Sequence, residues 1–134
     1  MKNLSPLETA EQKTLVEWLK IKKLNYFAIP NGAVLKGKTF QRARQMQKLK
    51  AEGLIAGTSD IVVFTPTKML FIEMKRIKGS SVSQEQKDFI EMVNQYPYAV
   101  GKVCKGAAAA IEFIEKYLNV QGLHKDQSTI KFGE

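Results

Sequence analysis

Hydrophobic residues along the chain recur at spacings that alternate between helical and extended segments. Residues 6 to 22 have apolar residues at helical spacing, which predicts an amphipathic first helix. Residues 25 to 30 predict a short strand that ends in a turn. Residues 38 to 52 predict a second helix, which ends at Gly53 and whose buried stripe we expect to consist of Ala43, Met46 and Leu49.

Residues 57 to 75 contain two apolar runs that are rich in β-branched residues. The break between the runs reads Thr-Pro-Thr-Lys, which predicts two antiparallel strands joined by a four-residue turn. If Phe64 and Met69 face each other across this turn, the same register places Asp60 opposite Glu73. The hairpin is therefore where the sequence brings two acidic side chains together.

A capping box predicts where the helix after the hairpin begins. Ser83 is the N-cap, Gln86 reaches back to the Ser83 amide, and we expect the helix to run to residues 96 and 97. A strand over residues 98 to 104 and a helix over residues 107 to 118 follow. This order of elements predicts an α/β sandwich with a mixed sheet.

The bulk composition fits one soluble globular domain. We expect residues 1–118 to form this domain and residues 119–134 to be a C-terminal tail. The chain has 21 Lys and Arg against 13 Asp and Glu, a net charge of +8, which favours a polyanion as partner. No apolar run approaches the roughly 18 residues of a membrane span, and no signal-peptide pattern is visible, so we expect a cytoplasmic protein without membrane contact.

Cysteine and histidine are too rare in this chain for several common chemistries. Cys104 is the only cysteine and His124 is the only histidine. Intramolecular disulfides, cysteine zinc sites and nearly all histidine-based mechanisms are therefore excluded. Acidic side chains and lysines are left as the main candidates for chemistry.

The predicted register makes Asp60, Glu73 and Lys75 the candidate chemical centre. Like charges that face each other on adjacent strands lie roughly 5 Å apart and destabilise the sheet unless something offsets them. A divalent ion such as Mg²⁺ or Mn²⁺ does so, because carboxylate oxygens are hard ligands. Lys75 shares the face of Glu73 by strand alternation. The alternative is a solvated edge ion pair, but we expect this face to be buried by Ile61, Val63, Leu70 and Ile72.

Several short motifs occur in a fixed order around this centre. They are Gly53-x3-Gly57-x2-Asp60 and Glu73-x-Lys75, with Ile29-Pro30-Asn31-Gly32 upstream and Ser83-x2-Gln86 downstream. The ordered set resembles the VRR-NUC (virus-type replication-repair nuclease) domain of the PD-(D/E)xK nuclease superfamily, although Ser59 stands where that family usually has proline. The resemblance implies a restriction-endonuclease-like three-layer sandwich with a central mixed β-sheet flanked by helices.

The resemblance implies a set of metal ligands. These include the Asp60 and Glu73 carboxylates, the Met74 main-chain carbonyl and a first-helix glutamate, and the ion would be Mg²⁺ or Mn²⁺. Either Glu8 or Glu11 could supply that glutamate, and the sequence leaves the choice open. Acids at a helix N-terminus also complement the helix dipole without any metal.

Further residues of the catalytic site are implied by the same resemblance. Lys75 would orient or deprotonate the attacking water and offset charge in the transition state. Gln86 would lie near the active site as well as cap its helix, which requires one side chain to make both contacts. Supporting roles are implied for Gln12, Asn31 and Gly57.

Positive charge is concentrated before and after the predicted hairpin. A helix face with many cations is usually only solvated, but the one-sided excess here favours contact with DNA phosphates. The expected DNA-binding residues are Lys36, Lys38, Arg42, Arg44, Lys48, Arg76 and Lys78.

Together these features predict a Mg²⁺- or Mn²⁺-dependent DNA endonuclease. The family includes small phage and bacterial proteins that resemble Holliday junction resolvases, so the expected substrate is branched DNA in replication, repair or recombination. Two symmetric cuts favour a homodimer, with Tyr96, Tyr98 and residues 130 to 132 as candidate contacts. The alternatives are a catalytically inactive basic DNA-binding module and a nuclease acting on ordinary duplex or flap DNA.

Overall fold

A four-stranded mixed sheet lies at the centre of the computed structural model, which describes residues 6–30 and 37–119. β1 (Tyr26–Ala28) pairs antiparallel with β2 (Ile61–Phe64), and β2 pairs antiparallel with β3 (Met69–Lys75). β3 pairs in parallel with β4 (Ala99–Lys105). The predicted strands are confirmed in place and order, although β1 is shorter than the sequence predicts.

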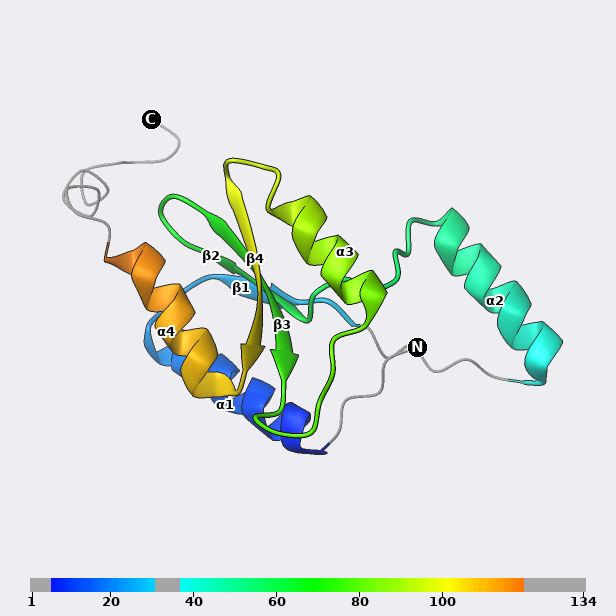
Figure 1. Ribbon diagram of the computed structural model, residues 1–134, viewed down its shortest axis with the longest axis horizontal. Coiled ribbons are helices and arrows are strands. Elements are labelled where there is room, and N and C mark those ends of the chain that lie inside the picture. Colours follow the sequence, from blue (N-terminus) through cyan, green and yellow to red (C-terminus); the bar gives the residue numbers. More distant parts are fainter. Residues whose placement is uncertain (1–5, 31–36, 120–134) are drawn as a thin grey trace.

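Helices cover both faces of the sheet. α1 (Pro6–Ile21) and α4 (Ala107–Leu118) pack together on one face, and α3 (Gln84–Val93) lies on the other (Figure 1). The predicted α/β sandwich is therefore confirmed, with helical layers on either side of a mixed sheet. Within the described ranges, no helix combines the length and apolar character that a membrane crossing requires.

The central hairpin has the predicted register. Phe64 faces Met69, and the Thr65 N–H donates to the Lys68 carbonyl at 2.9 Å across the turn. The ladder ends at Ile61, opposite Ile72. Asp60 lies just beyond this last pair, and its N–H donates to the Ile72 carbonyl at 2.9 Å. The predicted pairing of Asp60 with Glu73 is therefore not part of the ladder.

The main hydrophobic core lies between the sheet and the α1–α4 layer. It contains alternate residues of β2 and β3 that are fully buried, namely Ile61, Val63, Leu70 and Ile72. Glu73 and Lys75 are intervening residues of β3, so they point to the opposite face, where α3 lies. The expectation that these apolar residues share the face of the acids is therefore wrong, because strand alternation separates them.

The capping box at the start of α3 is confirmed. The Ser83 hydroxyl accepts from the Gln86 N–H at 3.1 Å, and the Gln86 side-chain oxygen accepts from the Ser83 N–H at 3.0 Å. Both bonds satisfy N–H groups that have no partner inside the helix. The helix ends at Val93, before the predicted residues 96 and 97.

The helix α2 (Thr39–Ala51) ends with the predicted glycine signal. Gly53 has a φ of 109°, and the Leu54 N–H reaches back to the Leu49 carbonyl at 2.9 Å. A left-handed residue with this back-bond is how many helices terminate, and glycine adopts it without strain.

α2, drawn in cyan in Figure 1, stands apart from the three layers. None of its residues is buried: Ala43 is exposed, and Met46 and Leu49 are half-buried. The predicted buried stripe is therefore wrong, because no layer of the sandwich packs against that face. The helix instead presents most of its side chains to solvent.

Candidate active site

Two carboxylates are buried at the end of β3 that lies near α3. Asp60 is 3% exposed and Glu73 is 0% exposed. The Asp60 Oδ2 accepts a hydrogen bond from the Met74 N–H at 2.7 Å, which holds this carboxylate beside the residue that follows Glu73. Burial of two ionised carboxylates is costly unless bound partners offset their charge.

Glu73 has two partners on a single oxygen atom. Its Oε2 accepts from the Gln86 Nε2 at 3.2 Å and lies 3.8 Å from the Lys75 Nζ. Lys75 is itself only 6% exposed, and its carbonyl accepts from the Gly106 N–H at 2.8 Å. The ammonium group is therefore held next to Glu73 by a strand that stays paired with β4 as far as Lys75.

The Gln86 side chain makes two contacts at once. Its Oε1 completes the capping box with Ser83, and its Nε2 donates to Glu73. Because the first contact fixes the position of the amide, the second contact is directed at Glu73 by the start of α3. Gln86 is 6% exposed, so little water competes for either bond.

Gly57 fixes the loop before Asp60 against α3. It has a φ of 83°, and a Cβ atom at this position would lie 2.3 Å from the Glu85 carbonyl oxygen. Any side chain would therefore clash with the first turn of α3 and also strain the backbone. The glycine allows close packing next to Gln86, which gives its implied supporting role a physical basis.

The first helix places its two candidate glutamates differently. The Glu11 Oε2 accepts from the Ala107 N–H at 2.9 Å, and so caps α4, whose own N-cap residue is Gly106. Glu8 is 7% exposed, and the side-chain oxygen of Gln12, one turn later, is buried with no hydrogen-bond partner among the described residues. The structural role of Glu11 has no local signal in the sequence, because its partner is 96 residues away.

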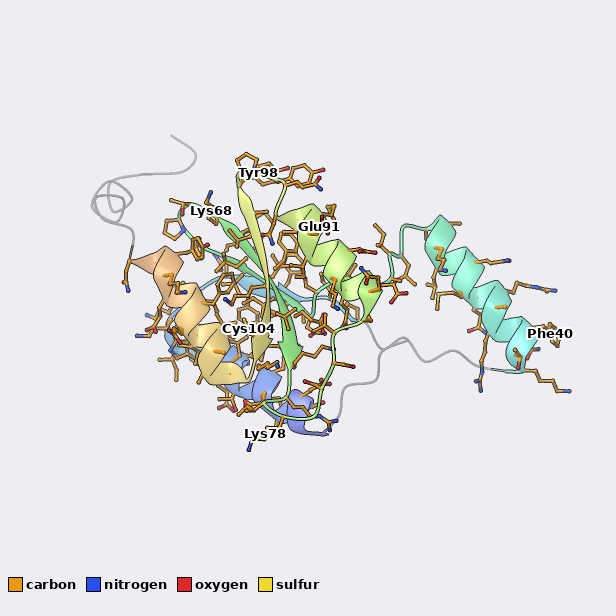
Figure 2. All side chains as sticks on the ribbon, in the orientation of Figure 1. Phe40, Lys68, Lys78, Glu91, Tyr98 and Cys104 are labelled. Atoms are coloured by element: carbon orange, nitrogen blue, oxygen red, sulfur yellow. The ribbon has the colours of Figure 1, made fainter. Side chains whose placement is uncertain are left out.

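Most of the expected DNA-binding residues lie on the surface. The described members on α2 and its N-cap are exposed, and Figure 2 shows Phe40, at the start of this helix, projecting away from the sheet. Lys78 is exposed, whereas Arg76 is half-buried and donates to the Gly79 carbonyl at 2.7 Å. Lys36 and Asn31 lie outside the described residues.

A cavity of about 540 Å³ next to this centre was not expected from the sequence. Lys75 and Gln86 form part of its lining, together with residues of α2 and of the loop that follows it. A signal was present in the sequence, because the apolar pair Leu54-Ile55 lies between two glycines where a polar turn is more usual.

Comparisons with known proteins place the chain in context. A family model for the VRR-NUC domain matches residues 8–108. A solved structure described as a VRR-NUC domain protein superimposes with a TM-score of 0.66 and 24% sequence identity, covering 88% of this chain and 91% of the other. At this identity the structural likeness concerns the fold alone. No curated protein matches the chain.

Proposed function

Since the chain belongs to the VRR-NUC family of nuclease-type domains, we propose that it is a divalent-metal-dependent endonuclease that hydrolyses DNA phosphodiester bonds. The observation that carries this proposal is the cluster at the end of β3. Two carboxylates, a lysine and an amide are buried there. The Asp60 carboxylate accepts a hydrogen bond from the Met74 N–H, and the Glu73 carboxylate contacts both Gln86 and Lys75. Such a cluster costs stability in a protein that has no use for it.

The donor atoms fit a hard divalent cation. Asp60, Glu73 and the Met74 carbonyl would hold Mg²⁺ or Mn²⁺, with Glu8 as the first-helix ligand because Glu11 is engaged in capping α4. Among the described residues, no three acidic, histidine or cysteine side chains are close enough to hold an ion alone. Because Mg²⁺ usually keeps several waters and takes only one or two carboxylates directly, at least one of these three carboxylates would act through a bound water. The bound ion would supply Lewis-acid polarisation of the scissile phosphate.

Lys75 and Gln86 would supply the remaining catalytic functions. Lys75, whose Nζ lies 3.8 Å from the Glu73 Oε2, would orient the attacking water as an ammonium or deprotonate it as a neutral amine, and the ammonium form would offset negative charge as the phosphate reacts. Gln86 would act as a positioning residue, because it holds the Glu73 oxygen from the start of α3. Residues that orient a metal ligand commonly contribute about 10- to 100-fold to metal affinity or activity.

Exposed cations on α2 would bind the DNA backbone. Lys38, Arg42, Arg44 and Lys48 are all exposed, and the first turn of the helix contains no acid. Phosphate contacts supply affinity without reading sequence, so the shape of the DNA is the more plausible basis for selectivity. We therefore infer that branched DNA, such as a Holliday junction in phage or bacterial replication, repair or recombination, is the preferred substrate.

A homodimer would supply the two active sites that a four-way junction requires. Tyr96 and Tyr98 are 46% and 57% exposed, with ring centroids 5.6 Å apart, and together offer an apolar contact surface. Residues 130 to 132, the other candidate contact, lie outside the described residues. Light scattering is expected to give a mass twice the 15.1 kDa of one chain.

A panel of DNA substrates tests the proposed activity and its selectivity. Four-way junction, splayed arm, flap, linear duplex and single strand are incubated with the protein and Mg²⁺, Mn²⁺ or EDTA. We expect cleavage with either metal, fastest on the junction, and none in EDTA. Faster cutting of flap or linear duplex would favour the alternative nuclease reading, and binding without any cleavage would favour an inactive DNA-binding module.

A further inference from the structure

The cavity beside the candidate active site is large enough to bind a small molecule. Its volume of about 540 Å³ lies within the range of roughly 300 to 1,000 Å³ that is typical of ligand sites. Lys75 and Gln86 line it, and both contact the same oxygen atom of Glu73. A group bound in the cavity would therefore lie next to the proposed reacting atoms.

The walls of this cavity combine apolar surface with positive charge. Met46 from α2 contributes apolar surface, as do Leu54 and Ile55 from the following loop, and Ile55 is 57% exposed although it is a large apolar residue. Lys50 adds a second ammonium group to the lining, besides that of Lys75. The lining suits a ligand that has a flat apolar part and a negatively charged part, which describes a nucleotide.

Glu85 is the one acidic side chain in the lining. It lies in the first turn of α3, where a negative charge is favourable because of the helix dipole. Its charge disfavours a phosphate on that side of the cavity. The phosphate of a bound nucleotide is therefore expected near Lys75, whose Nζ lies 3.8 Å from the Glu73 carboxylate.

The apolar wall is held in place at both ends. The Leu54 N–H is bonded to the last turn of α2, and Gly57 packs so closely on α3 that a Cβ atom would lie 2.3 Å from the Glu85 carbonyl oxygen. A wall fixed in this way loses little conformational entropy when it covers a ligand. The loop that carries Leu54 and Ile55 is thus fixed at both of its ends before any ligand binds.

We propose that this cavity binds a single unpaired nucleotide next to the scissile phosphate, with its base against Leu54 and Ile55. The proposal rests on the proposed nuclease function and narrows its substrate to DNA that has an unpaired nucleotide at the cleavage site. A base inside a duplex is stacked on both faces and cannot enter the cavity without leaving the stack. That cost is smallest where a base is already unpaired, as at a branch point, bulge or end.

Fluorescent DNA tests the proposal without any cleavage. Two labelled duplexes differ only in whether one 2-aminopurine is paired or unpaired, and each is titrated with the full-length protein in EDTA. Wild-type protein is expected to bind the unpaired duplex about tenfold more tightly than the paired one. The emission of the unpaired 2-aminopurine is expected to rise on binding, because the base leaves the stack of the DNA. Ile55→Ser should lower that preference roughly five- to tenfold, the effect of losing contact with one aliphatic side chain.

Two further variants make the result specific. Ile21→Ser is the matched control, since Ile21 is 76% exposed on α1 and does not line the cavity. Met46→Ala tests the apolar surface that α2 contributes and should lower the preference as well. Equal affinity of the wild type for both probes, or equal behaviour of Ile55→Ser and Ile21→Ser, would overturn the proposal.

The same proteins distinguish failure of this proposal from failure of the nuclease function. Each is incubated with Mg²⁺ and the paired and unpaired substrates, and cleavage is followed on gels. Cleavage that is insensitive to Ile55→Ser would leave the nuclease function intact and remove the nucleotide site. An Ile55-dependent preference in binding with no cleavage at all would do the reverse.

Discussion

Glu11 and Glu8 should respond to mutation in opposite ways, because α1 uses them differently. The Glu11 carboxylate accepts from the Ala107 N–H at 2.9 Å and so caps α4, which has no side-chain cap of its own. Loss of a cap costs about 0.5 to 2 kcal/mol, and a charged acceptor lies toward the upper end of that range. In a domain of this size, 1 kcal/mol corresponds to a change in Tm of about 4 °C. Glu11→Ala should therefore lower the Tm by about 4 to 8 °C while DNA cleavage at 25 °C stays near the wild-type rate.

Glu8→Gln should show the opposite pattern. Its Tm in EDTA should stay close to that of the wild type, but the rise in Tm caused by Mn²⁺ and the cleavage of DNA should both be lost, because the variant lacks a ligand. Glu11→Gln is the conservative control, since an amide oxygen can still accept from Ala107 and should restore most of the stability. If Glu11→Ala abolished cleavage with no change in Tm while Glu8→Gln remained active, the assignment of the two residues would be refuted.

Three further outcomes follow from the same geometry. Gln86→Ala should lower the cleavage rate about 10- to 100-fold because Glu73 loses its positioning partner, whereas the exposed Gln84→Ala, measured by the same steady-state assay, should not. Charge reversal of Arg42, Arg44 and Lys48 on α2 should weaken binding to every DNA tested. The slope of log Kd against log salt concentration should fall by about one for each phosphate contact that is lost. Reversal of the exposed lysines at the end of α1 is the control and should change neither quantity. Burial raises the pKa of the Cys104 thiol to about 11, so at pH 8 iodoacetamide should modify it far more slowly in native protein than in urea, and equal rates would contradict its burial.

Local signals in the sequence were sufficient for much of the fold. The Thr-Pro-Thr-Lys turn determined the register of the hairpin, and Ser83 with Gln86 located the start of α3, because each of these patterns acts over a few residues. Gly53 likewise marked the end of α2. These features depend on backbone chemistry that neighbouring residues specify by themselves.

Other features depend on partners that are distant in the sequence. The half-buried state of Met46 in α2 reflects the absence of a covering layer, which the spacing of apolar residues cannot reveal. The role of Glu11 depends on α4, at the far end of the domain. The pattern alone likewise could not tell that α3 would cover the acids and complete their surroundings with Gln86.

Cleavage by Asp60→Asn is the most direct test of the central claim that the cluster at the end of β3 is a metal-dependent nuclease site. Wild type, Asp60→Asn and Asp88→Asn are compared on the best substrate of the panel with Mg²⁺ and Mn²⁺; Asp88 is the matched control because it is exposed on α3. The account predicts that wild type and Asp88→Asn cut equally well, that neither cuts in EDTA, and that Asp60→Asn binds the DNA but does not cut it. An Asp60→Asn protein that cuts at the wild-type rate, or a wild type that cuts no DNA with either metal, would contradict it.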